Sequence, residues 1–362
     1  MHDNPDIRER HGGNIYGVRE GVTDFSANIS PLGMPDEVRR AAEDAVMRSD
    51  IYPDVAAAAL RKAASKATGV DENAFAFGCG ACDLIYRITL ALRPERVLIE
   101  GPAFSEYEAA ARLSGAEIAF HLEPESCGFR TRTDALIGAI TERKPDVVFV
   151  ATPSNPAGTV TKTEDMLRIL AVCEGTGAKL VADVCFSHFV LGKASELYSC
   201  ISSRRGELHK GLIIIDSFTK IFATAGIRFG FAAFGDTEDA RLATNILQPW
   251  PVSTVAAAAG IKCFGLGAKA VEAANYTAVQ RKRMTEELNA MGLKAFDGEA
   301  NYILIKGSKN LAQQLLTKGF LVRNCANYAG LGKEFIRVAV KRADENGRLL
   351  AAFREIMQWQ KR

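Results

Sequence analysis

Short apolar runs alternate with longer amphipathic stretches between residues 74 and 234, and this alternation limits the possible fold more than any other feature of the sequence. The short runs are apolar at consecutive positions, which is typical of strands buried on both faces of a sheet. The longer stretches, such as 83–91, 105–113 and 164–174, have the spacing of amphipathic helices. The alternation therefore predicts a large α/β domain on a mostly parallel sheet. Seven strands are expected, at residues 74–77, 96–99, 117–121, 147–151, 179–182, 212–215 and 230–234.

The pattern changes after Trp250-Pro251 and predicts a second, smaller α+β domain. A long helical stretch, 252–288, comes first, and a helix at 345–360 closes the chain. Three strands are expected between them, at residues 301–306, 320–323 and 335–340. The predicted division is an N-terminal arm (1–40) that packs with the small domain, a large domain (41–247) and a small C-terminal domain (248–362).

The charge balance provides no basis for binding nucleic acid or an anionic membrane. Lys and Arg number 45 against 43 Asp and Glu, so the formal net charge is only +2. Any bound anion must be held by local groups. No run approaches the roughly 18 apolar residues of a membrane helix, and the first residues are acidic and polar, unlike a signal peptide. We therefore expect a cytoplasmic protein with a small-molecule ligand.

The eight cysteines are too scattered for a disulfide scaffold and suit a reducing compartment. Cys79 and Cys82 have the CxxC spacing of a zinc or redox half-site. No second pair follows, and no histidine cluster lies near enough in the sequence to complete four ligands. We expect ordinary buried or loop thiols here, and no metal.

Residues suited to ligand binding lie at or near the ends of several expected strands, where ligands bind in open α/β sheets. The small-residue loop 78–83 enters a helix and offers free N–H groups to an anion, although such loops also occur for tight packing alone. The other candidates are Asn155 after 147–151, Asp183 after 179–182, Ser217 and Lys220 after 212–215, and Arg228 shortly before 230–234. Each has an ordinary explanation alone, such as a surface lysine or a capping serine. Their order on successive strand ends predicts one common site.

The set Asn155-Pro156-x-Gly158, Asp183, Ser217-x-x-Lys220 and Arg228 resembles the fold type I pyridoxal-phosphate enzymes of the aspartate aminotransferase superfamily over nearly the whole chain. The resemblance implies the type I PLP-dependent transferase fold and pyridoxal 5′-phosphate (PLP) as cofactor. Lys220 would hold the cofactor as a Schiff base and later shuttle a proton. Asp183 would pair with the protonated pyridine nitrogen, and Asn155 would bond the ring hydroxyl oxygen.

The resemblance implies further contacts with the cofactor. Phe104 would stack on its ring. The phosphate would be bound by Gly80, Ala81, Cys82, Ser217, Thr219 and Arg228. Tyr52 matches a residue that reaches the phosphate of the neighbouring subunit, so a homodimer with active sites at the subunit interface is expected.

Within the superfamily, the chain is most similar to the histidinol-phosphate aminotransferases and to the threonine-phosphate decarboxylases of cobalamin synthesis. The segments 11–14, 24–33 and 323–328 favour the decarboxylases. The expected reaction is decarboxylation of L-threonine O-3-phosphate, or of serine phosphate, the former giving (R)-1-amino-2-propanol phosphate. The alternatives are a histidinol-phosphate-type aminotransferase that uses 2-oxoglutarate and glutamate, and a PLP-binding protein without catalysis.

Four residues are expected to bind substrate. Arg337 matches the substrate-anion arginine of the family, and Arg323 resembles a second one in the decarboxylases, although it would also fit a surface ion pair. His11 would reach the substrate phosphate, or lie free in solvent, and Asn28 lies in one of the decarboxylase-like segments.

Four positions depart from the usual residues of these families. Phe186 stands where the aminotransferases have a tyrosine that bonds the ring oxygen, and phenylalanine cannot make that bond. Val184 replaces a glutamate, and Cys79 and Cys82 replace polar residues of the phosphate loop. These departures bear on the substrate more than on the cofactor.

Overall fold

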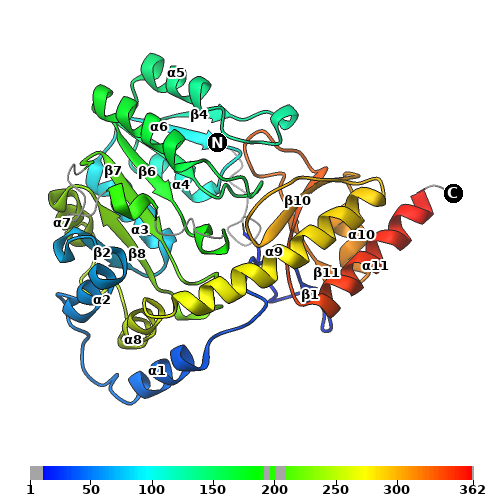
Figure 1. Ribbon diagram of the computed structural model, residues 1–362, viewed down its shortest axis with the longest axis horizontal. Helices are drawn as coiled ribbons and strands as arrows, with labels where there is room; N and C mark the ends of the chain where they lie inside the picture. The colour runs from blue at the N-terminus through cyan, green and yellow to red at the C-terminus, as the bar shows by residue number, and fades with distance from the viewer. Residues whose placement is uncertain (1–10, 191–195, 201–208, 361–362) are drawn as a thin grey trace.

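A seven-stranded sheet forms the centre of the larger part of the molecule (Figure 1). The computed structural model describes residues 11–190, 196–200 and 209–360, so the first ten residues of the predicted N-terminal arm lie outside the described part. The strand order is β2-β8-β7-β6-β5-β3-β4, and β8 alone runs in the direction opposite to the other six strands. The strands are β2 (Phe75–Gly78), β3 (Arg96–Gly101), β4 (Glu117–Leu122), β5 (Val147–Ala151), β6 (Lys179–Asp183), β7 (Leu212–Asp216) and β8 (Gly230–Phe234). The predicted α/β class with a mostly parallel sheet is confirmed.

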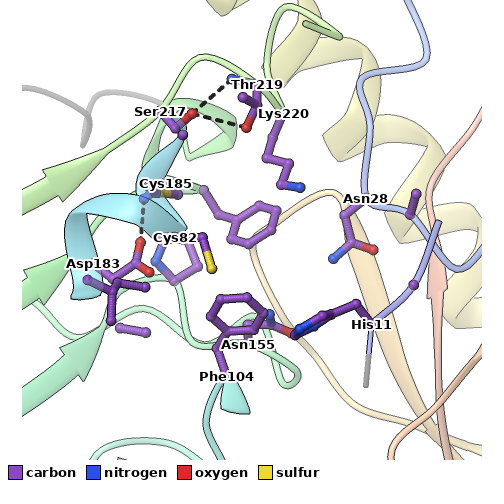
Figure 2. A pocket seen from close by; sticks show the side chains of 18 of the residues that line it. His11, Asn28, Cys82, Phe104, Asn155, Asp183, Cys185, Ser217, Thr219 and Lys220 are labelled. Carbon is purple, nitrogen blue, oxygen red and sulfur yellow. Dashed lines mark hydrogen bonds between the residues drawn. The ribbon is translucent and has the colours of Figure 1, made fainter. Parts of the chain in front are cut away.

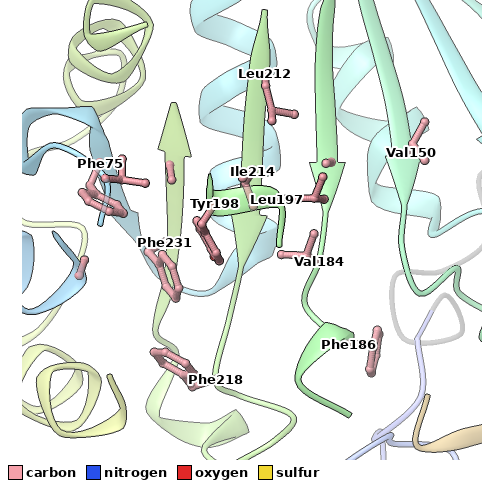
Figure 3. Close-up of a cluster of buried hydrophobic side chains, with 14 of the residues drawn as sticks. Phe75, Val150, Val184, Phe186, Leu197, Tyr198, Leu212, Ile214, Phe218 and Phe231 are labelled. Atoms are coloured by element: carbon pink, nitrogen blue, oxygen red, sulfur yellow. The ribbon is translucent and has the colours of Figure 1, made fainter. Parts of the chain in front are cut away.

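The central strands are apolar at consecutive positions because both faces of the sheet are covered. In β6, Leu180 and Ala182 pack into one hydrophobic cluster while Val181 packs into another on the opposite face. Figure 3 shows the first cluster, in which Ile214 and Phe231 from neighbouring strands take part. The helices of this part of the chain are α1 (Asp36–Val46), α2 (Ala58–Thr68), α3 (Ala81–Leu92), α4 (Ser105–Leu113), α5 (Thr133–Arg143), α6 (Thr163–Thr176) and α7 (Thr237–Asn245).

A smaller antiparallel sheet with the order β12-β13-β10-β9 lies beside the large one (Figure 1). Its strands are β9 (Lys294–Ala295), β10 (Tyr302–Lys306), β12 (Arg323–Asn324) and β13 (Phe335–Ala339). They share a hydrophobic core with α9 (Gly267–Ala290), α10 (Leu311–Thr317) and α11 (Ala343–Gln360). The N-terminal strand β1 (Thr23–Asp24) pairs in parallel with β11 (Phe320–Leu321) at the edge of this part.

Two predicted elements of the smaller part are wrong in detail. The expected strand 320–323 is divided, because its first half pairs with β1 and its second half pairs with β13. The expected helix 252–288 is two helices, α8 (Thr254–Cys263) and α9, bent by 78° at the break. Phe264 lies in that break and packs edge-on against Phe218 with ring centroids 5.0 Å apart, so its burial against the large core accompanies the bend.

The packing of α8 bears on the predicted domain division at 248. Ala256, Ala259 and Cys263 of α8 are buried in the core of the large sheet, and α1 packs against the same helix. Helix α9 then runs from the large sheet toward the small one (Figure 1). The predicted boundaries stay a prediction.

Among the described residues, no single helix is long and apolar enough to cross a membrane. Helices α8 and α9 reach that length and apolar composition only when the bent pair is counted as one. In the same part of the chain, no three His, Cys, Asp or Glu side chains come together as a possible metal site.

Candidate active site

A cavity of ≈ 320 Å³ lies at the carboxyl ends of the parallel strands, where the two sheets meet (Figure 2). It is lined by every predicted site residue except Tyr52. These residues are His11, Asn28, Gly80, Ala81, Cys82, Phe104, Asn155, Asp183, Ser217, Thr219, Lys220, Arg228, Arg323 and Arg337. The residues that follow strands come together here because parallel strands bring their carboxyl ends to the same edge of the sheet.

One end of the cavity is an anion cradle at the start of α3. Gly80 precedes the helix with φ 85°, and no side chain among the described residues caps the first turn, so its leading N–H groups are uncapped where Gly80, Ala81 and Cys82 line the cavity. Arg228 lies over this turn and donates from Nη2 to the carbonyl of Cys79 at 3.2 Å. The helix amides and the guanidinium together favour a phosphate-sized anion.

Close backbone approach keeps this cradle compact. A Cβ on Gly230 would lie 2.4 Å from the carbonyl carbon of Gly80 and 2.5 Å from the nitrogen of Ala81. A Cβ on Gly80 would lie 2.7 Å from Nη2 of Arg228 and would also need a positive φ. Glycine is favoured at 230 because backbone atoms occupy the space of a side chain, and at 80 because of the positive φ.

The loop after β7 contributes the next part of the wall. Ser217 is buried, and its Oγ donates to the carbonyl of Phe229 at 2.7 Å. The same oxygen lies 3.0 Å from Oγ1 of Thr219 and accepts from the Thr219 N–H at 3.3 Å. These bonds hold the loop that ends at Lys220 against β8.

A carboxyl group and an amine line this one cavity. Asp183 ends β6, and its Oδ2 accepts from the hydroxyl of Tyr107 at 2.6 Å while Oδ1 accepts from the N–H of Cys185 at 3.0 Å. Burial raises the pKa of the Asp183 carboxyl. Burial lowers the pKa of the Lys220 amine, and the charges of Arg337 and Arg228 lower it further. The amine is therefore closer to its neutral, nucleophilic form than a surface lysine.

Asn155 and Arg337 join the two sheets across the cavity. Arg337, on β13, donates from Nη1 to Oδ1 of Asn155 at 2.5 Å and from Nη2 to the carbonyl of Ser26 at 2.8 Å. Tyr328 also donates to Oδ1 of Asn155, at 3.2 Å. The Nε of Arg337 is buried and has no hydrogen-bond partner among the described residues. The amide NH₂ of Asn155 remains a donor that a ligand oxygen can use.

Arg323 lies directly opposite Arg337 in the antiparallel pair of β12 and β13. Both side chains line the cavity and both are buried. Nη2 of Arg323 donates to Oδ1 of Asn327 at 2.6 Å, and its guanidinium lies 5.5 Å from the ring centre of Tyr328. Like charges directly opposite in a sheet repel each other, so this pair is suited to a site that receives anions.

His11 lines the side of the cavity that lies away from Ser217 and Lys220 (Figure 2). Its Nε2 lies 2.8 Å from Oε1 of Glu106, and its ring centre lies 5.3 Å from that of Phe104. Figure 2 shows the rings of His11 and Phe104 beside each other. Glu106 also accepts from the hydroxyl of Tyr86 at 2.6 Å. His11 is therefore paired with a carboxylate rather than free in solvent.

Asn28 reaches the cavity from the N-terminal segment (Figure 2). It is buried, and its Oδ1 has no hydrogen-bond partner among the described residues. A buried acceptor without a donor is costly, so this oxygen favours a ligand that donates a proton to it.

Tyr52 lies outside this cavity, but it lines a neighbouring pocket together with Arg228. Its ring is 77% exposed and stacks on Trp250 with centroids 4.5 Å apart. Its predicted contact with the neighbouring subunit stays a prediction. Of the departures, Cys79 is exposed and lies outside the cavity, Val184 is buried in the core of the large sheet, and Phe186 lines the cavity.

Sequence reasoning missed three functional neighbours, Tyr107, Cys185 and Ser26. Tyr107 could have been found, because it lies three residues after Phe104 and so faces the same way at the start of α4. Ser26 contributes its carbonyl oxygen, and its residue type carries no such signal.

The donor set fits pyridoxal 5′-phosphate. The uncapped helix turn and Arg228 suit its phosphate, the Asp183 carboxyl suits a basic ring nitrogen, and the amine of Lys220 suits its aldehyde. Phe104 provides an aromatic face on the wall of the same cavity.

The chain belongs to the class I and II aminotransferase family, whose sequence model matches residues 20–353. The cofactor of this family is pyridoxal 5′-phosphate, which confirms the predicted cofactor. The chain is 32% identical to a threonine-phosphate decarboxylase of Salmonella typhimurium, over 96% of each chain.

Solved structures agree on the fold. The histidinol-phosphate aminotransferase of Clostridium acetobutylicum superposes with a TM-score of 0.84 at 27% identity, over 92% of this chain and 98% of the other. The histidinol-phosphate aminotransferase of Sinorhizobium meliloti in complex with pyridoxal-5′-phosphate superposes with a TM-score of 0.79 at 19% identity, over 92% and 90%. The predicted resemblance is confirmed at the level of family, fold and cofactor.

Proposed function

We propose that this protein is a PLP-dependent decarboxylase of a phosphorylated amino acid, with L-threonine O-3-phosphate as its substrate and (R)-1-amino-2-propanol phosphate as its product. The observation that carries this proposal is the opposed pair Arg323 and Arg337 in the cavity wall. Threonine phosphate carries a carboxylate and a phosphate, whereas histidinol phosphate carries only a phosphate. The likeness to the Salmonella typhimurium threonine-phosphate decarboxylase supports the same choice.

The two arginines are assigned to bind the two anionic groups of the substrate. Arg337 is held rigidly by Asn155 and Ser26, so its guanidinium can orient a bound anion. Its buried Nε and the buried Oδ1 of Asn28 are a donor and an acceptor that a bound substrate would satisfy. His11, paired with Glu106, adds a cationic group for the phosphate when it is protonated.

Lys220 and Asp183 are assigned to hold the cofactor, the amine at the aldehyde and the carboxylate at the ring nitrogen. When bound, pyridoxal 5′-phosphate supplies an electron sink for the bonding pair that is released as carbon dioxide leaves. One proton must then replace the carboxylate on the α-carbon. The ammonium form of Lys220 is assigned to donate that proton and to become the neutral amine, because burial lowers its pKa and makes the ammonium a stronger acid than that of a surface lysine.

A homodimer is part of the proposal, with Tyr52 reaching the partner's phosphate site. The exposed side chains Met47, Ile51 and Tyr52 lie close in sequence and support an apolar contact there. Light scattering after size-exclusion chromatography should give twice the 39.1 kDa mass of the chain. A monomer at micromolar concentration would contradict this part. We also propose the cytoplasm as its location.

The test of the reaction is carbon dioxide release from O-phospho-L-threonine by PLP-loaded protein without any oxo acid. O-phospho-L-serine and unphosphorylated threonine are run beside it, because one methyl group is worth only about 1–3 kcal/mol of discrimination. We expect release from the phosphorylated substrates only. Turnover of histidinol phosphate that requires 2-oxoglutarate, with no carbon dioxide from either phosphoamino acid, would establish the aminotransferase instead.

A further inference from the structure

A second strand-end acid, Asp216, lies next to the active site without lining the cavity. It ends β7 and is fully buried. Its Oδ2 accepts from the hydroxyl of Tyr198 at 2.8 Å and lies 2.9 Å from Nε2 of His188. Its Oδ1 accepts from the N–H of Ser217 at 2.7 Å. Neither the cavity wall nor the assigned chemistry accounts for this cluster.

The Asp216 carboxyl group favours the protonated form of His188. Burial by itself lowers the pKa of His188, but the Asp216 carboxylate outweighs it and raises that pKa above its ordinary value. Tyr198 keeps its proton, since burial and the same carboxylate raise its pKa far above the ordinary value. A buried carboxylate is costly unless donors satisfy it, and here three donors do so.

The carboxylate links these donors to the loop that carries the cofactor-binding residues. Asp216 holds the N–H of Ser217, and Ser217 in turn bonds Thr219 and the carbonyl of Phe229. Lys220 follows directly. The loop 217–220 thus begins at a peptide group whose position depends on the Asp216 side chain. His188 comes from the segment that follows Asp183 at the end of β6.

We propose that His188 and Tyr198 are positioning residues that act through Asp216 to set the loop of Ser217, Thr219 and Lys220 for cofactor binding. The inference rests on the proposed function, in which this loop holds the phosphate and the aldehyde of PLP. Neither residue touches the cavity, so their substitution leaves every cofactor contact chemically intact. A change in PLP binding therefore reports on the position of the loop.

The test compares His188→Gln and Tyr198→Phe with His121→Gln. His121 is a matched control, because its Nε2 lies 3.2 Å from Oε1 of Glu123 and its side chain is 12% exposed, against 14% for His188. The dissociation constant of PLP is measured by fluorescence titration, and melting temperatures are measured with and without PLP. We expect PLP binding about tenfold weaker for His188→Gln and several-fold weaker for Tyr198→Phe. The melting-temperature increase on adding PLP should shrink in both. His121→Gln should keep the parent's PLP affinity and the parent's increase in melting temperature on adding PLP.

The outcomes separate the two proposals. If the parent binds PLP and both variants bind it equally well, with melting temperatures lowered by the same amount with and without PLP, the cluster is only structural and the inference is overturned. If the parent does not bind PLP, the proposed function fails first. Should His188→Gln not fold, Tyr198→Phe still decides, because it keeps the contact between His188 and Asp216 and removes one hydrogen bond.

Discussion

The packing of Gly230 against the start of α3 allows the anion cradle to be tested by adding one methyl group. In Gly230→Ala, the new Cβ would lie 2.4 Å from the carbonyl carbon of Gly80 and 2.5 Å from the nitrogen of Ala81. An ordinary contact is about 3.5 Å or longer, so strand and helix must separate by roughly 1 Å. Both contacts are to backbone, so no side-chain rotation relieves them.

Two consequences are expected. Overpacking of this kind costs about 1–3 kcal/mol in the free energy of unfolding. The separation also moves the leading N–H groups of α3 away from Ser217 and Arg228, and a misplacement of about 1 Å in a binding constellation can cost on the order of 100-fold. We therefore expect Gly230→Ala to weaken PLP binding by about 10- to 100-fold.

Gly226→Ala is the matched control. This glycine lies in the same loop region, is exposed, and has no atom within 4 Å of an added Cβ. Its free energy of unfolding should stay within about 0.5 kcal/mol of the parent, and its PLP affinity should be unchanged. Urea unfolding and PLP titration measure both quantities. Parent-like PLP affinity in Gly230→Ala would refute the reasoning, because the cradle would then tolerate the separation.

Three further predictions concern the amine, the substrate and an acid away from the cavity. Lys220→Ala should abolish the borohydride-reducible adduct with PLP, seen as loss of the cofactor mass on the intact protein; a persisting adduct would remove this residue from the site. Arg337→Ala should cost about 3–5 kcal/mol in kcat/KM for O-phospho-L-threonine, because the Asn155 oxygen and the substrate anion both lose a charged partner; an unchanged kcat/KM would contradict its assignment. Burial raises the pKa of Glu100 to about 7, so the folded protein keeps a proton that the unfolded chain loses above pH 4.5, and the free energy of unfolding falls as the pH rises from about 4.5 to 7. Urea unfolding at pH 4.5 and pH 8 measures this fall in the free energy of unfolding, and Glu100→Gln should make it smaller by at most about 3 kcal/mol. An equal fall in parent and variant would refute the raised pKa of Glu100.

Much of the site could be predicted because each residue follows a recognisable strand or opens a helix. Asp183 ends an apolar strand, where an acid is conspicuous, and Lys220 follows another in the same sheet. Strand direction then brings such residues together without knowledge of any side-chain contact. The limits of the prediction appear where secondary structure is short: the run 320–323 was expected as one strand, but its partners divide it.

The sequence alone determined the sheet, its mostly parallel course and the residues at its carboxyl edge, because these depend on local hydrophobic patterns and on the chirality of the connections. Three features became visible only in the folded chain: the pairing of Arg337 with Asn155, the bond from Tyr107 to Asp183, and the cluster of His188, Tyr198 and Asp216. The first two pairs lie 182 and 76 residues apart in the chain. A hydrogen bond needs its two groups within about 3 Å, and across such separations only the packing of the folded helices and sheets sets that distance.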